Sequence, residues 1–322
     1  MDLRAELGQL SWFARQYRHP SRWKKQVQVI RHMDSPHIRR RRRHSGEVWG
    51  VSIVRDEVDV VGLTVRHLLD QGVSRILVAD NCSVDGTREL LRSLARTTRR
   101  VAVVTDHEPT YYQSEKMTWL AHQAWRGGAD WIVPFDADEF WFAEGMSIAE
   151  YLGTLDAGTG IVHAEFCHMV PTAPAPDDLA AAEFIMDTHP AFPGKVAVRA
   201  HPLLEIITGN HGASRVGANA KGLHIAHAQY RSPVQIARKV RQGNAAASRT
   251  GEDLSWFSPH WASGSRLGDE EIQEVWENIS HGRPDERIRF EATGPMVRLH
   301  PLTWRTWDPD GVVARAQRAA DA

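Results

Sequence analysis

The sequence has few cysteines and no long hydrophobic run. Only Cys82 and Cys167 occur among its 322 residues, so no disulfide framework holds the fold and a reducing compartment is expected. No apolar stretch approaches the ~18 residues of a membrane span, and the first residues lack the apolar core of a secretory signal. We therefore expect a cytoplasmic protein.

Three motifs of common enzyme classes are also missing. The first predicted strand is not followed by GxGxxG, and neither GxxxxGK[ST] nor GxSxG occurs, which disfavours dinucleotide oxidoreductases, P-loop nucleotidases and α/β-hydrolases. Hydrophobic residues make up 42% of the chain and charged residues 25%, an ordinary globular composition that excludes a mainly disordered chain. At about 150 residues per domain, the length suggests roughly two domains, or one large domain with extensions.

Charge is distributed unevenly along the chain. Residues 1–46 form a basic N-terminal extension with 12 Lys/Arg and 3 Asp/Glu, a net charge of +9, so the remainder carries −10. This extension could approach anionic lipid or a phosphorylated acceptor, or bind nucleic acid on charge alone. We favour a solvated extension whose apolar stripe docks on the acidic remainder, because charge runs are weak signals of function. The apolar stripe consists of Leu3, Leu7, Leu10, Ala14 and Tyr17. The charge run is the series of five arginines from Arg39 to Arg43.

Strands and helices alternate between residues 48 and 135. Such alternation implies right-handed crossovers and a mostly parallel sheet, which binds ligands at the carboxyl ends of its strands. We expect Asp56 to cap the first helix. The pattern predicts strands at 48–54, 75–79, 101–105 and 131–135, and helices at 58–69, 87–94 and 113–125.

Polar residues follow three of these strands. Carboxylates there can accept hydrogen bonds from a ribose or a base, or hold a divalent cation that binds phosphate. Asp136 and Asp138 can reach one cation together, and Ala137 between them leaves room for a ligand; alternatively, Asp136 caps a turn and Asp138 is solvated. The three groups are Arg55-Asp56-Glu57, Asp80-Asn81 with Asp85, and Asp136-Ala137-Asp138.

The motifs over residues 48–142 resemble the nucleotide-binding half of glycosyltransferase family 2. VSIVRDE, QGVSRILVADNCSVDGT and GGADWIVPFDADEFW occur in this order, most like the branch with a DADEF-type motif. The resemblance implies an α/β GT-A fold with a mostly parallel central sheet and helices on both faces. It also implies a metal-dependent, inverting transfer of sugar from a UDP-, GDP- or dTDP-sugar to an acceptor hydroxyl.

The resemblance also implies roles for individual residues. Glu57 and Asp80 would contact the base and ribose with Asp85 beside them, and Asp136 and Asp138 would hold Mn²⁺ or Mg²⁺ on the diphosphate. Many relatives have Asp in place of Asn81, and this difference weakens any prediction of which nucleobase the donor carries. Lys116 either neutralises the diphosphate or pairs with Glu115. The remaining donor-binding candidates are Arg55, Asn81 and Ala137.

A later segment supplies a third candidate metal ligand. Within a strand predicted at 223–229, His224 and His227 point to opposite faces. HAQYRSPVQIARKVRQG resembles a family element that selects His227, although a hydrogen-bonded core histidine is the alternative. Ser232 is expected to cap a helix that starts at Pro233. Arg231 and Lys239 are candidate diphosphate partners, with a solvated position favoured for Lys239.

The catalytic base is not fixed by spacing. Glu205, which precedes a polar turn holding His211, ranks first and Glu165 second, although a surface position is a strong alternative for Glu205. His211 either orients the acceptor or stabilises the turn. Strands are also expected at 161–170 and 195–199.

We divide the remainder into a nucleotide-sugar-binding half at 47–145, an acceptor-binding half at 146–250 and a C-terminal extension at 251–322. The extension is rich in tryptophan, with Trp256, Trp261, Trp276, Trp304 and Trp307. These side chains either form a platform on which the acceptor sugar stacks, or serve core packing or a dimer contact, which is the commoner use. A non-catalytic nucleotide-sugar or carbohydrate-binding protein on the same scaffold is the alternative function. A nucleotidyltransferase is disfavoured because no basic triphosphate-gripping loop follows the first strand. We expect a small-molecule, lipid-linked or glycan acceptor and no nucleic-acid partner; a homodimer and a peripheral membrane contact remain open.

Overall fold

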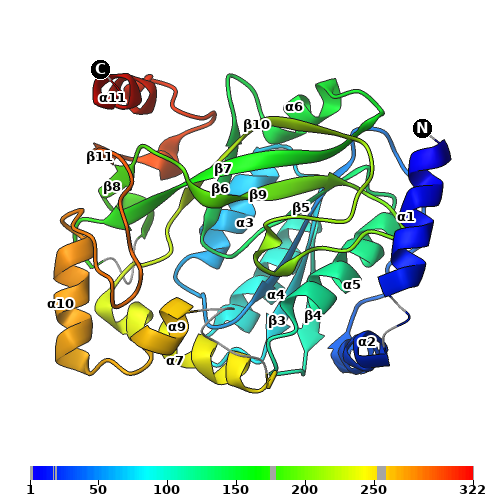
Figure 1. Ribbon diagram of the computed structural model, residues 1–322, viewed down its shortest axis with the longest axis horizontal. Coiled ribbons are helices and arrows are strands. Elements are labelled where there is room, and N and C mark those ends of the chain that lie inside the picture. Colours follow the sequence, from blue (N-terminus) through cyan, green and yellow to red (C-terminus); the bar gives the residue numbers. More distant parts are fainter. Residues whose placement is uncertain (1–2, 17, 19, 175–178, 252–258, 322) are drawn as a thin grey trace.

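A long twisted sheet runs through the molecule and carries helices on both faces (Figure 1). The computed structural model describes residues 3–16, 18, 20–174, 179–251 and 259–321. The α/β architecture that the sequence predicted, with a central sheet and flanking helices, is confirmed.

The strands of the main path follow the order β1-β4-β3-β2-β5-β9-β7-β10-β6, with β8 and β11 attached beside β7. Their bounds are β1 (Met33–Asp34), β2 (Val48–Val54), β3 (Arg75–Asn81), β4 (Val101–Asp106), β5 (Trp131–Pro134), β6 (Glu139–Ala143), β7 (Thr159–Pro171), β8 (Phe184–Asp187), β9 (Ala191–Arg199), β10 (Ala218–His227) and β11 (Met296–Leu299).

Helices flank the sheet and also lie near both termini of the chain. Their bounds are α1 (Leu3–Gln16), α2 (Pro20–His32), α3 (Val61–Asp70), α4 (Thr87–Thr98), α5 (Gln113–Arg126), α6 (Ile148–Thr154), α7 (Pro233–Ser248), α9 (Pro259–Gly264), α10 (Asp269–Ile279) and α11 (Val312–Ala320), with short 3₁₀ turns η1 (Leu179–Ala181), η2 (Thr208–Asn210) and η3 (Pro301–Thr303).

The sheet has a parallel half and a mixed half. β4, β3, β2 and β5 are mutually parallel, so their carboxyl ends meet at one edge. Beyond β5, β9 is antiparallel to both β5 and β7, and β6 is antiparallel to β10, whereas β10 runs parallel to β7. The sheet therefore continues without a break from the predicted nucleotide half into the predicted acceptor half.

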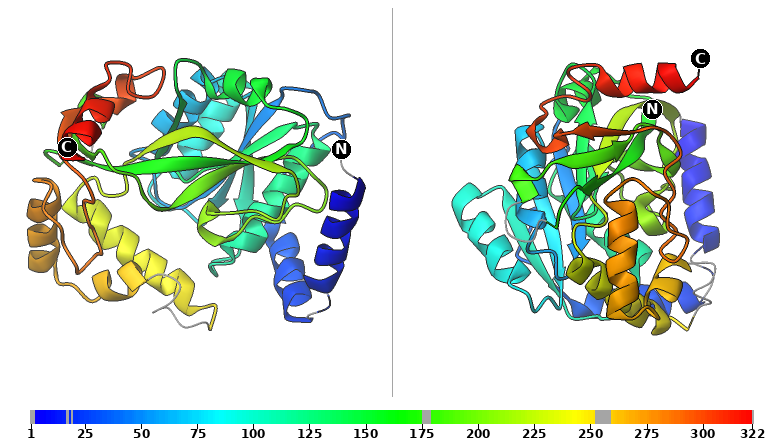
Figure 2. Two further views of the ribbon diagram at one scale, coloured as in Figure 1. Left: turned by 45° about the horizontal axis from the view of Figure 1, so that its top comes forward. Right: turned by 90° about the vertical axis from the view of Figure 1, so that its left-hand side faces the viewer.

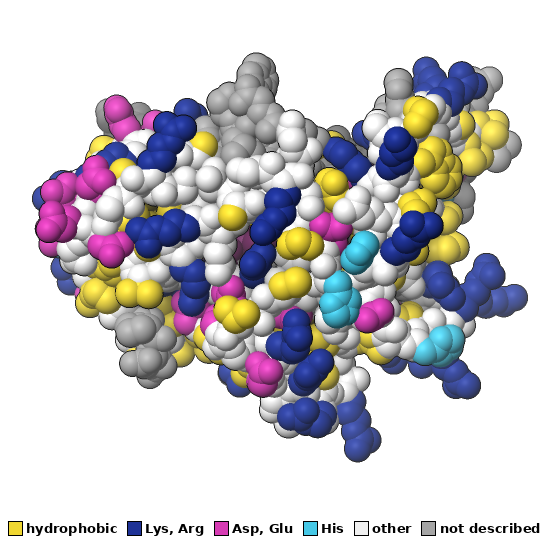
Figure 3. All heavy atoms as spheres, turned by 90° about the horizontal axis from the view of Figure 1, so that it is seen from below, with side chains coloured by type: hydrophobic (Ala, Val, Ile, Leu, Met, Phe, Trp, Pro, Cys, Tyr) yellow, Lys and Arg dark blue, Asp and Glu magenta, His cyan; other side chains and the backbone are white. Residues whose placement is uncertain are grey.

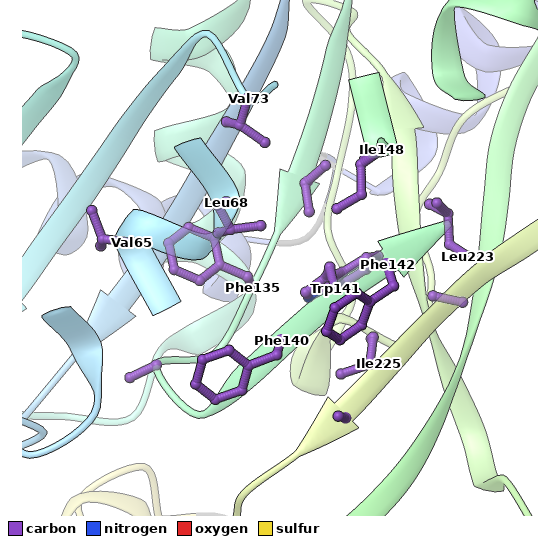
Figure 4. Packing of buried hydrophobic residues seen from close by; sticks show 14 of the residues in the cluster. Val65, Leu68, Val73, Phe135, Phe140, Trp141, Phe142, Ile148, Leu223 and Ile225 are labelled. Atoms are coloured by element: carbon purple, nitrogen blue, oxygen red, sulfur yellow. The ribbon is translucent and has the colours of Figure 1, made fainter. Parts of the chain in front are cut away.

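Alternation along β2 explains the two hydrophobic layers. Val48 and Val54 pack with α3 and α4, whereas Trp49 and Val51 face the opposite layer with α5 and α2. Figure 4 shows the first layer, where Val65 and Leu68 of α3 lie near Phe135 and the aromatic side chains of β6. The strand β6 was not predicted, and the burial of its residues 140–142 (Phe-Trp-Phe) explains why the acidic turn is followed by an apolar run.

Most predicted elements are confirmed, and one predicted helix cap is wrong. The four strands and three helices between residues 48 and 135 occur with shifts of a few residues at their ends. Asp56 does not cap α3, which begins at Val61; it has a positive φ of 53°, and its carboxylate accepts hydrogen bonds from the backbone N–H groups of Val84 and Asp85. Ser232 caps α7 as predicted, accepting a hydrogen bond from the Gln235 N–H, with Pro233 in the first turn.

The N-terminal helices pack at one end of the molecule, beside α5 and the segment after β9 (Figures 1 and 2). The prediction that the apolar stripe of α1 docks on the body is wrong for Leu7 and Leu10, which are exposed. Gln9 is buried instead, and its amide donates to the carbonyl oxygens of Leu203 and Ser214. Tyr17 lies outside the described residues. None of the described helices is long and apolar enough to cross a membrane.

Candidate functional site

A cleft of about 520 Å³ opens where the carboxyl ends of β2, β3 and β5 meet the mixed half of the sheet. This volume lies within the range of ~300–1,000 Å³ that is typical of ligand pockets. Many residues that the sequence marked as site candidates line this cleft. Among them are Arg55, Glu57, Asn81, Lys116, Asp136, Ala137, Asp138, His211, His227, Lys239 and Trp261.

The turn from β5 to β6 presents Asp136 and Asp138 to the cleft. Glu139 closes this turn, because its carboxylate accepts a hydrogen bond from the Asp136 N–H at 3.0 Å. The Ala137 carbonyl accepts from the Thr64 hydroxyl at 2.5 Å, and the Asp138 carbonyl accepts from the Ala228 N–H at 2.9 Å. The turn is thus fixed from α3 on one side and from the end of β10 on the other.

Asp138 lies at the centre of a charged cluster. Its side chain is almost fully buried and contacts the Lys239 ammonium, while its Oδ1 lies 3.4 Å from Nε2 of His227. Burial alone would raise the pKa of Asp138, but Lys239 and His227 hold the pKa well below its usual range. Because the Asp138 side chain is only 3% exposed, the alternative of a solvated Asp138 does not hold.

Asp136 faces a second cation. Lys195 of β9 lies 2.9 Å from both the Asp136 and Glu139 carboxylates, and the Asn210 amide donates to Asp136 Oδ1 at 3.1 Å. Burial would lower the pKa of the Lys195 ammonium, but the two carboxylates raise it above the ordinary value. Lys195 was not identified from the sequence, although a lysine at the start of an apolar strand was a usable signal.

The three predicted metal ligands do not converge on one point. Asp138 and His227 meet, but Asp136 is directed to Lys195 and Asn210. Within the described part of the chain, no three His, Cys, Asp or Glu side chains are grouped closely enough to hold a metal ion. A carboxylate oxygen and an imidazole nitrogen are suitable donors for Mn²⁺, so Asp138 and His227 fit as a two-residue site to which phosphate oxygens would add ligands.

Glu57 is held by a buried arginine. Arg231 follows β10, and its side chain is only 1% exposed; it contacts the Glu57 carboxylate and lies 2.7 Å from Asp59. Burial raises the pKa of Glu57 despite this arginine. Glu57 thus lines the cleft as predicted, but it reaches a ligand only beside a fixed guanidinium.

Several predicted donor residues have other partners. Asp80 does not appear in the cleft lining; it is fully buried and accepts from Arg88 at 2.6 Å. Asp85 is also outside the lining, and its carboxylate binds the Thr87 N–H at the start of α4. Lys116 lines the cleft but lies 2.7 Å from Asp106, so it is not paired with Glu115.

Neither predicted base lines the cleft. Glu205 forms an ion pair with Arg22 of α2 at 3.0 Å and borders a separate groove beneath α1 and α2. Glu165 is exposed on β7, and the cleft is lined instead by its neighbours Phe166 and His168. The alternation of β7 explains this, because residues 166 and 168 share a face that excludes 165.

The polar turn after β9 contributes His211 to the cleft. Its Nδ1 lies 2.9 Å from the Gly194 carbonyl oxygen, which can only accept, so Nδ1 carries the proton and Nε2 keeps a lone pair. Gly209 permits this packing, because a Cβ there would lie 2.5 Å from Nε2. Burial and the nearby Lys195 lower the pKa of His211.

His168 and His260 also line the cleft, and neither was identified from the sequence. His168 stacks near His227 with ring centroids 5.2 Å apart, and burial lowers its pKa to about 3. Among the tryptophans of the C-terminal extension, Trp261 lines the cleft, whereas Trp276 is buried in a separate core beside α7 and α10. Trp307 stacks on His224 at 4.9 Å, which confirms that His224 and His227 point to opposite faces. Trp256 and part of the loop at 171–178 lie outside the described residues.

One segment of the chain matches a family model. Residues 51–165 match the model of Glycosyl transferase family 2, which covers less than half of the chain but includes the end of β2, all of β3 and β5, and the Asp136–Asp138 turn. The match supports the resemblance that the motifs indicated and, with it, a glycosyltransferase that uses a nucleotide sugar. Membership of the DADEF-type branch is not part of this result.

Two solved structures with similar folds illustrate the structural comparison. S. aureus TarS 1–349 is 10% identical, with 71% of this chain and 78% of that chain covered at a TM-score of 0.36. The mannosyltransferase PcManGT from Pyrobaculum calidifontis, solved with GDP-Man and Mn²⁺, is 12% identical, with 87% and 84% covered at a TM-score of 0.36. Similarities at these TM-scores are too low to carry an argument. Curated protein sequences give no significant match.

Proposed function

We propose that this protein is a metal-dependent glycosyltransferase that moves a sugar from a nucleotide-diphosphate sugar to an acceptor hydroxyl. The observation that supports this most is the position of Asp138, which lies within the segment that matches family 2 and beside the carboxyl ends of the parallel strands, with His227 of β10 next to it. Because ligands of such sheets bind at this edge, the donor would lie across the ends of β2, β3 and β5.

A diphosphate that binds beside Asp136 and Asp138 would need a cation between itself and these carboxylates. Lys195 is already balanced by Asp136 and Glu139, and Lys239 by Asp138. A diphosphate that entered alone would bring uncompensated negative charge next to these carboxylates. Mn²⁺ or Mg²⁺ held by Asp138 and His227 would stabilise the charge that develops on the leaving diphosphate.

Lys239 must leave Asp138 for this to happen, and the structure gives it another position. Its ammonium lies 3.9 Å from Glu57 and 3.4 Å from the Gln229 carbonyl oxygen, so a short rotation of a flexible side chain keeps it paired. In that position Lys239 remains beside the diphosphate. This role differs from the solvated one that the sequence favoured.

His211 is our proposed base for the acceptor hydroxyl. The carboxylates that line the cleft, among them Glu57, Asp136 and Asp138, bind cations, whereas Nε2 of His211 has its lone pair available. In a single displacement, the acceptor oxygen bonds to the anomeric carbon, the bond from that carbon to the diphosphate breaks, and the acceptor proton passes to Nε2. The configuration at the anomeric carbon inverts.

A thermal-shift screen tests the proposed donor and metal. UDP-, GDP- and dTDP-sugars are added with and without Mn²⁺ or Mg²⁺, and one of them should raise the melting temperature only with metal. At a hundredfold excess over its dissociation constant, a ligand stabilises by about 2.7 kcal/mol. Asp138→Asn should abolish this shift, whereas the exposed control Asp34→Asn should keep it.

Two results would count against the proposal. One is a metal-dependent shift that persists in Asp138→Asn. The other is donor binding without release of free nucleoside diphosphate in any acceptor mixture, which would favour the alternative of a non-catalytic binding protein.

A further inference from the structure

The outer faces of α1 and α2 carry large hydrophobic side chains that the fold does not cover. In α2 the exposed residues Trp23, Val27 and Ile30 recur at helical spacing and share one face, and Leu7 and Leu10 do the same in α1. Their exposed fractions lie between 38% and 56%. Figure 3 shows hydrophobic side chains gathered over this end of the molecule.

Cations surround these hydrophobic residues. Figure 3 shows Lys and Arg side chains beside and below the hydrophobic group. The exposed residues of this segment include Arg18, Lys24, Arg31 and the run 39–42. Residues 1–46 carry a net charge of +9 against −10 for the remainder, so the positive charge of the chain is concentrated at this end.

Packing of the helices on the body does not require the exposed residues. Gln9 anchors α1 through hydrogen bonds to Leu203 and Ser214, and Arg22 anchors α2 through its ion pair with Glu205. Val29 is the buried contact of α2. The side chains of Leu7, Leu10, Val27 and Ile30 therefore stay largely exposed on the outer faces of α1 and α2.

We propose that the outer faces of α1 and α2 dock on an anionic lipid bilayer. Apolar side chains bounded by cations are the combination that partitions into a bilayer interface, and the two contributions together give stable binding where either alone is weak. A second copy of the chain fits this surface poorly, because it would bring two segments of +9 together. The acidic remainder is repelled by anionic lipid, which fixes the orientation.

This placement deepens the proposed function, on which the following step rests. The inner faces of the same helices line a groove with Gln9, Trp12 and Arg22. Tyr111 and Gln113 border both this groove and the cleft, so the two spaces adjoin. A bilayer on the outer faces lies beside this groove. A lipid-linked acceptor is therefore the acceptor class that the structure favours.

Vesicle sedimentation tests the docking without reference to activity. The full chain is mixed with vesicles of phosphatidylcholine alone or of phosphatidylcholine and phosphatidylglycerol in equal parts, and the bound fraction is measured at low and high salt. We expect binding only to the anionic vesicles and weakening by salt. Leu10→Ser with Ile30→Ser should lower the partition coefficient at least tenfold. Arg18→Gln and Lys24→Gln should each lower it about fivefold.

Matched controls keep the test decisive. Val84→Ser with Val234→Ser removes hydrophobic side chains that are more exposed but lie elsewhere, and it should leave binding unchanged. The melting temperature should stay constant in all these variants, since the residues are exposed. The proposal would be overturned by equal binding to both vesicle types or by no binding to either. It would also be overturned if Leu10→Ser with Ile30→Ser abolished self-association of the protein but left vesicle binding unchanged. Vesicle binding is measured without sugar transfer, so a failure of membrane docking can be distinguished from a failure of the proposed function.

Discussion

Removal of the buried Arg231 guanidinium should be the most damaging single change near the cleft. Its side chain is 1% exposed and binds Glu57, Asp59 and the Ala228 carbonyl, with Asp138 at 3.7 Å. Arg231→Met would leave two carboxylates, with exposed side-chain fractions of only 14% and 13%, that keep only the longer contacts of Lys239 with Glu57 at 3.9 Å and of Arg238 with Asp59 at 3.7 Å. Breaking a buried ion pair by removing one partner costs about 3–5 kcal/mol, so the free energy of unfolding should fall by that amount.

The nearby Arg238 provides the matched control. It lies 3.7 Å from Asp59 and 3.8 Å from Asp85, and its side chain is 29% exposed. Arg238→Met should therefore lower the free energy of unfolding by no more than about 1 kcal/mol. Both variants are compared by urea unfolding at neutral pH, followed by circular dichroism.

The sign of the pH dependence gives a second check. Burial would raise the pKa of Asp59, but Arg231 holds it below its ordinary value, so this pair stabilises the wild type above the unfolded-state pKa and the contribution is lost as pH falls. In Arg231→Met the pKa values of Asp59 and Glu57 should both rise, and protonation should relieve the buried charge. The difference between variant and wild type should shrink from neutral pH to ~5.

Neutralising the stranded carboxylates should rescue the protein. Glu57→Gln with Asp59→Asn, added to Arg231→Met, should recover most of the lost stability because no unpaired buried charge remains. The reasoning is refuted if Arg231→Met costs no more than Arg238→Met, or if the triple variant is as unstable as Arg231→Met.

Two further predictions concern catalysis and capping. His211→Gln should lower the rate of nucleoside diphosphate release by roughly 10²–10⁴-fold and remove the acidic limb of the pH profile, whereas the exposed control His37→Gln should change neither. In the wild type, the midpoint of this acidic limb should lie below the ordinary histidine pKa, because burial and Lys195 disfavour the imidazolium form of His211 more than Asp136 favours it. An acidic limb that survives in His211→Gln would exclude His211 as the base. Ser232→Ala should lower the free energy of unfolding by about 1 kcal/mol through loss of the α7 cap, and Ser232→Asp should restore it; equal stability of the serine and alanine forms in urea would contradict the capping role.

Short-range patterns predicted the parallel half of the sheet well. Apolar runs such as 48–54 and the strand-end position of Asp136 and Asp138 depend on local periodicity, which sequence records directly. The helix at Pro233 was predictable for the same reason, since its cap lies one residue before it. Predictions failed where distant residues decide the outcome, as for Asp56, which binds the backbone at residues 84 and 85 rather than capping α3.

Partners of buried charges could not be predicted from spacing. Lys195 meets Asp136 only because β9 runs antiparallel beside β5, a pairing without a local sequence signal. Asp80 belongs to the family pattern, yet its carboxylate accepts a hydrogen bond from Arg88 at the start of α4. Glu205 and Glu165 were chosen as carboxylates near polar segments, but strand alternation and the packing of α2 decide where they point.

The antiparallel pairing of β6 with β10 places His227 directly opposite Glu139. A slip of one residue would bring Ala226 or Ala228 to that place, and would turn every side chain of β10 to the other face. A misaligned chain could therefore be compact, with nearly native secondary structure, and still lack an imidazole beside Asp138. Chemical competence in this protein is a stricter criterion of correct folding than compactness.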